Sequence, residues 1–166
     1  MAILPLLTYP DIRLKTVSVS VTEFDSTLQS FIADLEETMR SGPPSVGIAA
    51  PQVGQFQRMV IVDVSAKPNI KHHGYLVLIN PEIIAWEGFA VGREGCLSVP
   101  DYTGKVIRAK TIQLTAQDET GHFKEYQMEG YEARAVQHEI DHLNGILFVD
   151  RVVSRRHDLF RRVEKI

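Results

Sequence analysis

The sequence predicts an α+β domain in which antiparallel sheets pack around a central helix, with one N-terminal and one C-terminal helix. Three observations support this fold class. Strand-like segments cluster between residues 59 and 128 instead of alternating with helices. Segments before and after that region follow helical periodicity. The length of 166 residues matches one domain and is too short for two well-buried cores, so we expect residues 1–166 to form a single catalytic unit.

The first predicted helix runs from about Asp25 to Arg40. Its apolar side chains recur at the i, i+3, i+4, i+7 spacing of one helical face: Leu28, Phe31, Ile32, Leu35 and Met39. Asp25 is a suitable N-cap, and the cluster Gly42-Pro43-Pro44 ends the helix.

Short segments rich in β-branched residues, separated by Gly, Pro or polar turns, predict the strands. They are Met59–Val64, Tyr75–Asn80, Glu82–Trp86, Lys105–Ala109 and Thr111–Gln117. Asp118–Gly121 is typical of a hairpin turn and leads into a further strand from about His122 to Met128. We therefore expect mostly antiparallel sheet over residues 59–128.

Two helices are predicted after the strands. The first covers about Tyr131–Leu143 and ends at Asn144-Gly145, which suits a left-handed cap. The second begins at Ser154 and has one apolar stripe, made of Leu159, Val163 and Ile166. The tail that contains it, residues 151–166, is basic. It has only two acidic residues, Asp158 and Glu164, against six basic ones: Arg151, Arg155, Arg156, Arg161, Arg162 and Lys165.

Composition excludes several classes of protein. Apolar residues make up 44% and charged residues 23%, which disfavours disorder and coiled coil. With 18 Lys and Arg against 21 Asp and Glu, the chain has no overall bias toward DNA or anionic membranes. Its apolar runs are far shorter than the roughly 20 residues that cross a bilayer. The first ten residues do not resemble a secretory signal, and the single Cys96 suits a reducing compartment such as the cytoplasm.

A metal-binding motif lies in the predicted helix Tyr131–Leu143. His138-Glu139-Ile140-Asp141-His142 is an HExxH sequence, in which the two histidines are one helical turn apart and can reach one metal ion. Glu139, next to the first histidine, is placed to hold a metal-bound water. Two surface histidines on a solvated helix are the alternative, but both fall on the same side as Tyr131 and Ala135, as on a helix face that packs inward.

Spacing alone does not decide the third ligand. The pattern of the metzincin peptidases fails, because Phe148 stands where their third histidine belongs. A zinc endopeptidase with a downstream glutamate would use Glu164. Cys96 is the other candidate, since a thiolate and two imidazoles leave one coordination position open for water. A free cysteine is, however, often only a small buried side chain.

Three segments taken together resemble the signature motifs of the peptide deformylases. They are Gly47-Ile48-Ala49-Ala50-Pro51-Gln52, the sequence EGCLS over residues 94–98, and QHEIDHLNG over residues 137–145. The resemblance spans nearly the whole chain. Two positions depart from the family pattern: Ser45 replaces a glycine that usually begins the first motif, and Glu132 replaces an apolar residue at the mouth of the side-chain pocket.

The resemblance implies a metal-dependent hydrolase that removes the N-terminal formyl group from formyl-methionine of new polypeptides. Cys96, His138 and His142 would bind one divalent metal, natively Fe²⁺, with Zn²⁺, Ni²⁺ or Co²⁺ possible in a purified protein. Glu139 would be the general acid and base that assists attack by metal-bound water. The side-chain amide of Gln52 and the backbone N–H of Leu97 would stabilise the oxyanion.

The resemblance also implies how substrate and partners bind. Backbone near Gly47 and Gly95 would pair with an extended peptide, while Val46 and Tyr131 would line the pocket for the methionine side chain. Glu94, with Arg108 as its partner, is a candidate for orienting one histidine; an ordinary surface ion pair is the alternative.

Further expectations concern the partners and the place of action. The basic C-terminal helix is a candidate for binding ribosomal RNA, or it is a solvated helix face. We expect a bacterial-type cytoplasmic enzyme, or one of organelle origin, that binds neither membranes nor specific DNA. A module that binds nascent chains or stores metal without turnover is the non-enzymatic alternative.

Overall fold

The computed structural model describes residues 2–162 and shows an α+β fold with three helices and an antiparallel sheet. The helices and strands are α1 (Ser26–Ser41), β1 (Gly47–Ala49), β2 (Met59–Asp63), β3 (Tyr75–Cys96), β4 (Val99–Gln117), β5 (Phe123–Glu129), α2 (Gly130–Leu143), α3 (Arg155–Asp158) and β6 (Leu159–Arg161). Within the described residues, none of these helices combines the length and apolar character needed to cross a membrane.

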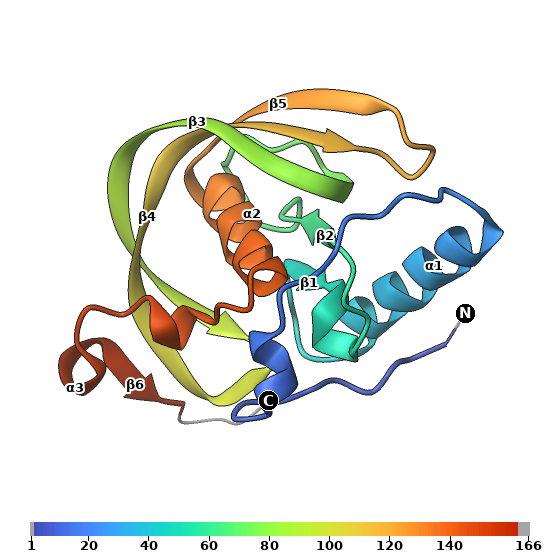
Figure 1. Ribbon diagram of the computed structural model, residues 1–166. Coiled ribbons are helices and arrows are strands. Elements are labelled where there is room, and N and C mark those ends of the chain that lie inside the picture. Colours follow the sequence, from blue (N-terminus) through green and yellow to red (C-terminus); the bar gives the residue numbers. More distant parts are fainter. Residues whose placement is uncertain (1, 163–166) are drawn as a thin grey trace.

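The sheet has the strand order β1-β2-β3-β4-β5, and every neighbouring pair is antiparallel. β6 lies off this path and pairs with β4. The long strands β3 and β4 curve strongly, and α2 lies in the hollow of this curve (Figure 1). The sheet therefore surrounds α2 on several sides, and α2 contacts β1, β2, β4 and β5.

β2 and β5 confirm the predicted strands Met59–Val64 and His122–Met128, but the other four predicted strands are parts of two longer ones. Tyr75–Asn80 and Glu82–Trp86 are both segments of β3, which passes Pro81 through a register shift between Ile79 and Glu82. A bulge of this kind accommodates a proline, which has no N–H for the sheet ladder. Lys105–Ala109 and Thr111–Gln117 likewise join in β4. The separate strands predicted from turn signals were therefore wrong at these two junctions.

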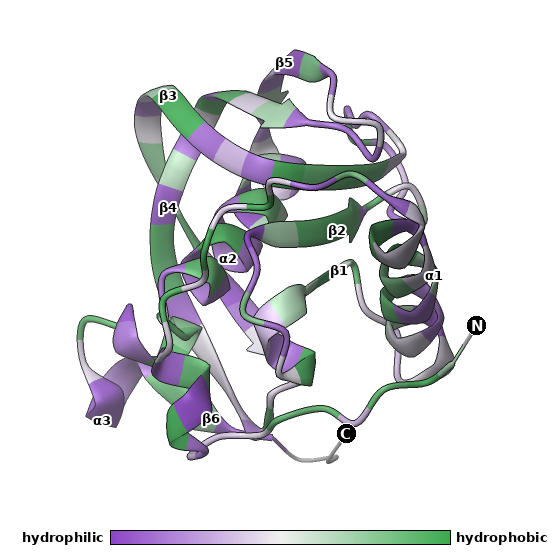
Figure 2. Cartoon of the chain, turned by 45° about the vertical axis from the view of Figure 1, so that its right-hand side comes forward, coloured by the Kyte–Doolittle hydropathy of each residue, from purple (hydrophilic) through white to green (hydrophobic). Residues whose placement is uncertain are grey.

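Helix α1 confirms the prediction for Asp25–Arg40. The Asp25 side chain accepts a hydrogen bond from the backbone N–H of Leu28 at 3.0 Å, as an N-cap does. Its apolar face packs on β1, β2 and the first part of β3, where Leu35, Ile48 and Ile61 are fully buried. The strand β2 is mostly apolar along its length (Figure 2). It lies buried between two groups of apolar side chains, one beneath α1 and the other beneath α2.

Helix α2 coincides with the predicted helix over Tyr131–Leu143. Its apolar face packs against the sheet through Ala133, Val136 and Leu143, all three fully buried. After the helix, Gly145 has a positive φ of 73°, and a Cβ there would lie 2.3 Å from the backbone oxygen of Lys15. Only glycine fits this conformation and this close contact, so the helix end is held against the segment near residue 15.

The predicted C-terminal helix begins where expected, with Ser154 as its N-cap, but within the described residues it is only one short turn. The helix α3 ends at Asp158, and β6 follows immediately, pairing Leu159 with Gly104 and Phe160 with Thr103 of β4. Sheet pairing and burial of Leu159 beside Phe148 override the helical spacing of the tail. Of the predicted apolar stripe, Val163 and Ile166 lie outside the described residues, as do Glu164 and Lys165.

Candidate metal centre

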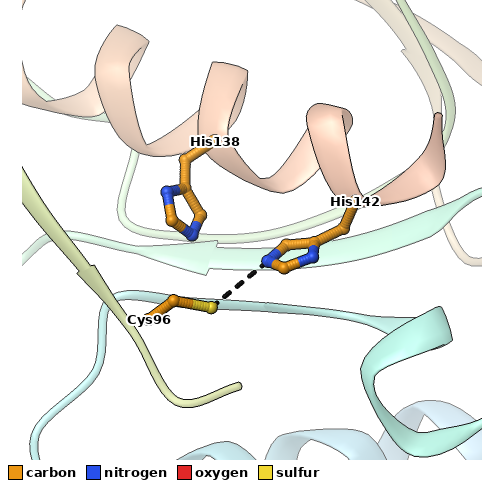
Figure 3. Close-up of side chains that lie close together, drawn as sticks. All are labelled: Cys96, His138 and His142. Carbon is orange, nitrogen blue, oxygen red and sulfur yellow. Dashed lines mark hydrogen bonds between the residues drawn. The ribbon is translucent and has the colours of Figure 1, made fainter. Parts of the chain in front are cut away.

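Three side chains from distant parts of the chain meet at the hollow of the sheet. Cys96 ends β3, while His138 and His142 lie one turn apart on α2. One atom from each, the sulfur and two ring nitrogens, all lie within 4.8 Å of one another. The Cys96 Sγ is 3.3 Å from His142 Nε2, and all three side chains point toward a common centre (Figure 3). This spacing suits three ligands of one metal ion.

A buried carboxylate orients His138. Glu94 Oε1 lies 2.8 Å from His138 Nδ1, which leaves the other ring nitrogen to face the centre. Arg108 binds both oxygens of Glu94, at 2.8 and 2.9 Å, and Arg134 Nη1 donates to Oε2 at 2.7 Å. Burial raises the pKa of Glu94, but hydrogen bonds from Arg108 and His138 outweigh it and hold that pKa well below its usual range. Glu94 is therefore an ionised partner of the histidine and not a surface ion pair.

The same arginine ties α2 to β4. Arg108 Nη1 donates to Asp141 Oδ2 at 2.6 Å, and Arg151 holds Asp141 with two further hydrogen bonds of 2.8 and 3.0 Å. Arg108 and Asp141 are both buried. Removing one partner of such a buried pair typically costs about 3–5 kcal/mol of stability, because an unpaired charge remains. The network therefore fixes the helix that carries both histidines.

Glu139 lies beside the three candidate ligands without a partner of its own. Its side chain is buried, and its Oε1 has no hydrogen-bond partner in the described structure. Burial raises the pKa of Glu139 to about 7. The carboxylate packs on Gly47, where an added Cβ would lie 2.7 Å from Glu139 Oε2. Gly47 thus leaves the space that this carboxylate occupies.

Gln52 is also buried here, against the expectation for a glutamine in a loop. It lies in a 3-10 turn (Ala50–Val53), where its Oε1 accepts from the backbone N–H of Ala49 at 2.8 Å. Its Nε2 donates to Ser98 Oγ at 3.0 Å and lies 3.6 Å from Cys96 Sγ. The two contacts aim the amide N–H₂ group at the sulfur side of the centre.

The electrostatics of the two histidines differ. Burial lowers the pKa of His142 well below its ordinary value, so its imidazole is neutral, the form that binds metals. Burial also disfavours charge on His138, but hydrogen bonds with Cys96 and Glu94 raise its pKa well above the ordinary value. The Cys96 sulfur and the Glu94 carboxylate therefore stabilise a positive charge at His138. A divalent cation bound beside His138 would supply such a charge.

A cavity of about 650 Å³ opens onto this centre. Its walls come from the loop before β1, the end of β3 and the first three turns of α2, and they include Val46, Gly47, Gly95, Leu97 and Tyr131. Cys96, His138 and Glu139 lie in the same wall. The cavity therefore joins a potential metal site to an apolar pocket and to the backbone of two strands.

Comparison with known proteins identifies the family of the chain. The family model described as "Polypeptide deformylase" matches residues 3–158. The chain is 42% identical over 167 residues to the peptide deformylase of Acidobacterium capsulatum, covering 100% of this chain and 96% of that protein. The chain belongs to the peptide deformylase family.

Solved structures of peptide deformylases share the fold. That of Thermotoga maritima has a TM-score of 0.85 at 37% identity and covers 93% of this chain and 100% of its own. The Acinetobacter baumannii structure described as Met-Ala-Ser bound has a TM-score of 0.82 at 37% identity, covering 91% and 99%. As a family member, this chain is an enzyme that removes formyl groups.

Within this deformylase fold, the structure brings the expected site residues together, with one exception. Glu132 does not line the cavity of the metal centre in the described structure. It is buried at the start of α2, where it accepts hydrogen bonds from the backbone N–H and the ring of His73, each at 2.7 Å. The helix thus turns Glu132 toward the loop before β3, so this departure from the family pattern adds no charge to the lining of that cavity.

Sequence reasoning missed four residues of this region of the deformylase fold: Ser98, Arg134, Asp141 and Arg162. Arg134 is four residues before His138 and Asp141 lies inside the HExxH motif, so helical spacing was a usable signal for both. For Ser98 and Arg162 the sequence carries no such local signal, since each depends on contacts between distant segments.

Proposed function

We propose that residues 1–166 form one catalytic domain that hydrolyses the N-terminal formyl group of formyl-methionyl peptides with one divalent metal. The observation that carries this proposal is the convergence of Cys96, His138 and His142 within 4.8 Å, beside the unpartnered carboxylate of Glu139. We place the activity in a bacterial-type cytoplasm, where polypeptides begin with formyl-methionine.

The donor set fits a divalent metal. A thiolate with two imidazoles is a donor set that would hold Fe²⁺, Zn²⁺, Ni²⁺ or Co²⁺. A metal held by Cys96, His138 and His142 supplies Lewis acidity toward water and toward the formyl oxygen. We propose Fe²⁺ as the native ion, and sulfur ligation makes the site sensitive to oxidation at Cys96.

Glu139 is the proposed general acid and base. A catalytic base works best when its pKa lies near the working pH, and burial raises that of Glu139 to about 7. It accepts the proton of the attacking water and then passes it to the departing amine. Its free Oε1 and its fixed position against Gly47 support this role.

Gln52 and the backbone N–H of Leu97 are the proposed donors to the oxyanion. We expect Gln52→Ala to lower kcat by about 10²–10³-fold, the usual effect of removing one such donor. Formate release should be measured at equal metal content, with the exposed Gln127→Ala as the matched control. Undiminished kcat in Gln52→Ala would exclude this role.

The proposed substrate path runs along β1 and β3. The Met-Ala-Ser bound structure from Acinetobacter baumannii supports a short peptide as occupant of such a cavity. Val46 and Tyr131 offer apolar walls for the methionine side chain. Backbone at Gly47 and Gly95 would pair with the extended peptide. The Ser45 hydroxyl donates to the backbone oxygen of Gly47 at 2.9 Å, and the second lone pair of this oxygen remains available to a peptide N–H.

Formate release from formyl-Met-Ala-Ser tests the proposed function. Protein purified anaerobically with Fe²⁺ should release formate, a chelator should abolish the release, and added Fe²⁺ should restore it. Elemental analysis of the same samples should show one metal per chain in the active protein. Peptide binding without formate from the iron-loaded enzyme would instead support a binding module.

Exposed arginines of the tail are the proposed contact with ribosomal RNA. Arg155 and Arg156 lie on α3 and Arg161 on β6, and all three side chains are exposed although the helix ends at Asp158. We expect a triple substitution to glutamine to abolish ribosome binding, and the wild-type binding to weaken steeply with salt. Co-sedimentation with ribosomes measures both, and binding that ignores salt and substitution would refute the contact.

A further inference from the structure

The strand end that carries Cys96 also bears a basic surface on its other face. Side chains alternate along a strand, so Arg93 and Gly95 face away from Glu94 and Cys96. The burial follows this alternation, since Glu94 and Cys96 are buried whereas Arg93 and Gly95 are exposed. The outward face of this strand end is therefore exposed to solvent, and it carries the cationic side chain of Arg93.

Strand β6 adds to this face. Phe160 pairs with Thr103 of β4, and its ring lies 4.0 Å below the guanidinium carbon of Arg93. Lys105, the partner of Arg93 across the β3 and β4 ladder, places its Nζ 5.7 Å from the same ring. The Phe160 ring thus contacts the face of the Arg93 guanidinium.

Arg162 completes the surface and reaches the cavity. Its backbone N–H donates to the oxygen of Asp101 at 2.8 Å, which fixes the residue beside β4. Its side chain lines the same cavity as Cys96 and His138. A Cβ on Gly95 would lie 2.5 Å from Arg162 Nη2, so the guanidinium covers Gly95, and the missing side chain makes room for it.

Among the described residues, the arginines at this rim have no carboxylate partner, unlike the other two arginines of the cavity. Arg40 is paired with Glu36 and Asp63, and Arg134 is paired with Glu94. Within residues 2–162, neither Arg93 nor Arg162 forms an ion pair with a carboxylate, and the buried Nε of Arg162 has no hydrogen-bond partner. Guanidinium N–H groups without a carboxylate partner among the described residues therefore lie at the cavity beside Gly95, the residue before Cys96.

We propose that Arg162, assisted by Arg93, forms a subsite that selects an acidic side chain at the second residue of the formyl-methionyl substrate. This inference rests on the proposed function and adds a sequence preference to it. Guanidinium groups bind carboxylates in a bidentate way and repel cations, so aspartate or glutamate is favoured and lysine disfavoured.

The direction of the substrate side chains assigns this subsite to the second residue. The methionine side chain enters the cavity between Val46 and Tyr131. In an extended peptide the next side chain points to the opposite side. A residue that pairs with Gly95 directs its side chain to the same face as the absent Gly95 Cβ, and that is where the Arg162 guanidinium lies.

Three matched peptides test the subsite: formyl-Met-Asp-Ser, formyl-Met-Ala-Ser and formyl-Met-Lys-Ser. For the wild-type enzyme we expect kcat/KM for the Asp peptide to exceed that for the Lys peptide by about 3- to 10-fold, mainly through KM, as for a partly exposed charge pair. Arg162→Gln should bring the ratio close to one, by lowering kcat/KM for the Asp peptide relative to the Lys peptide. Arg162→Glu should reverse the preference.

The exposed Arg156→Gln serves as the matched control and should keep the wild-type ratio. Equal kcat/KM for the Asp and Lys peptides in the wild type would overturn the subsite, as would a preference unchanged in both Arg162 variants. Formate release from the Ala peptide separates this failure from a failure of the proposed function, which would leave all three peptides formylated.

Discussion

Replacing Glu139 by glutamine should lower formate release by about 10²–10⁴-fold, the usual contribution of a positioned general acid and base. Glutamine keeps the size of the side chain and fills the space against Gly47, but it cannot accept a proton. The three candidate metal ligands are untouched, so the metal should stay bound. The loss should therefore appear in kcat and not in metal content.

Formate release should be measured for each purified protein, and the metal content of the same sample should be determined in parallel. Glu125→Gln, at an exposed position of β5, controls for the loss of one carboxylate and should behave as wild type. If metal-loaded Glu139→Gln turned over as fast as wild type, the proton would have to travel by another group. A storage or binding module would show the same metal content and no formate in either protein.

Replacing Cys96 by serine should remove both the metal and the activity. A neutral hydroxyl is a far poorer ligand than a thiolate for a borderline metal, and even loss of an outer partner weakens metal binding by about 10–100-fold. We therefore expect at least a 100-fold loss of metal affinity, by the same scale. The two imidazoles that remain on α2 cannot hold the ion in competition with a chelator.

Elemental analysis after gel filtration, together with a far-UV spectrum to confirm folding, checks this prediction. Ser98→Ala alters a buried neighbour of Cys96 without removing a candidate ligand, so it should retain the metal. Metal retention in Cys96→Ser would favour a different third ligand, such as the glutamate of a zinc endopeptidase. The residue weighed for that role, Glu164, lies outside the described part of the chain.

Local spacing in the sequence was informative where a single helix holds the chemistry. His138 and His142 share one face of α2 because helical geometry alone puts i and i+4 one turn apart. The N-cap at Asp25 and the left-handed Gly145 follow from equally local rules. The tail shows the limit of such rules, since Leu159 and Phe160 pair with β4 and do not continue the helix.

The parts of the site that join distant segments could not be derived from spacing. Cys96 meets His142 across 46 residues, and Glu94 meets Arg108 only because β3 and β4 pair in one particular register. The family resemblance named Gln52 in advance, whereas spacing alone left Cys96 and Glu164 as rival candidates for the third ligand.

Helix and turn formation depend on neighbours within a few residues, so the helix with both histidines could be predicted from the chain alone. Contacts across the sheet depend on strand register, bulges and the curvature of β3 and β4, which local patterns do not encode. Folding therefore decided that Glu139 rests on Gly47, that Glu132 turns to His73, and that Arg162 covers Gly95.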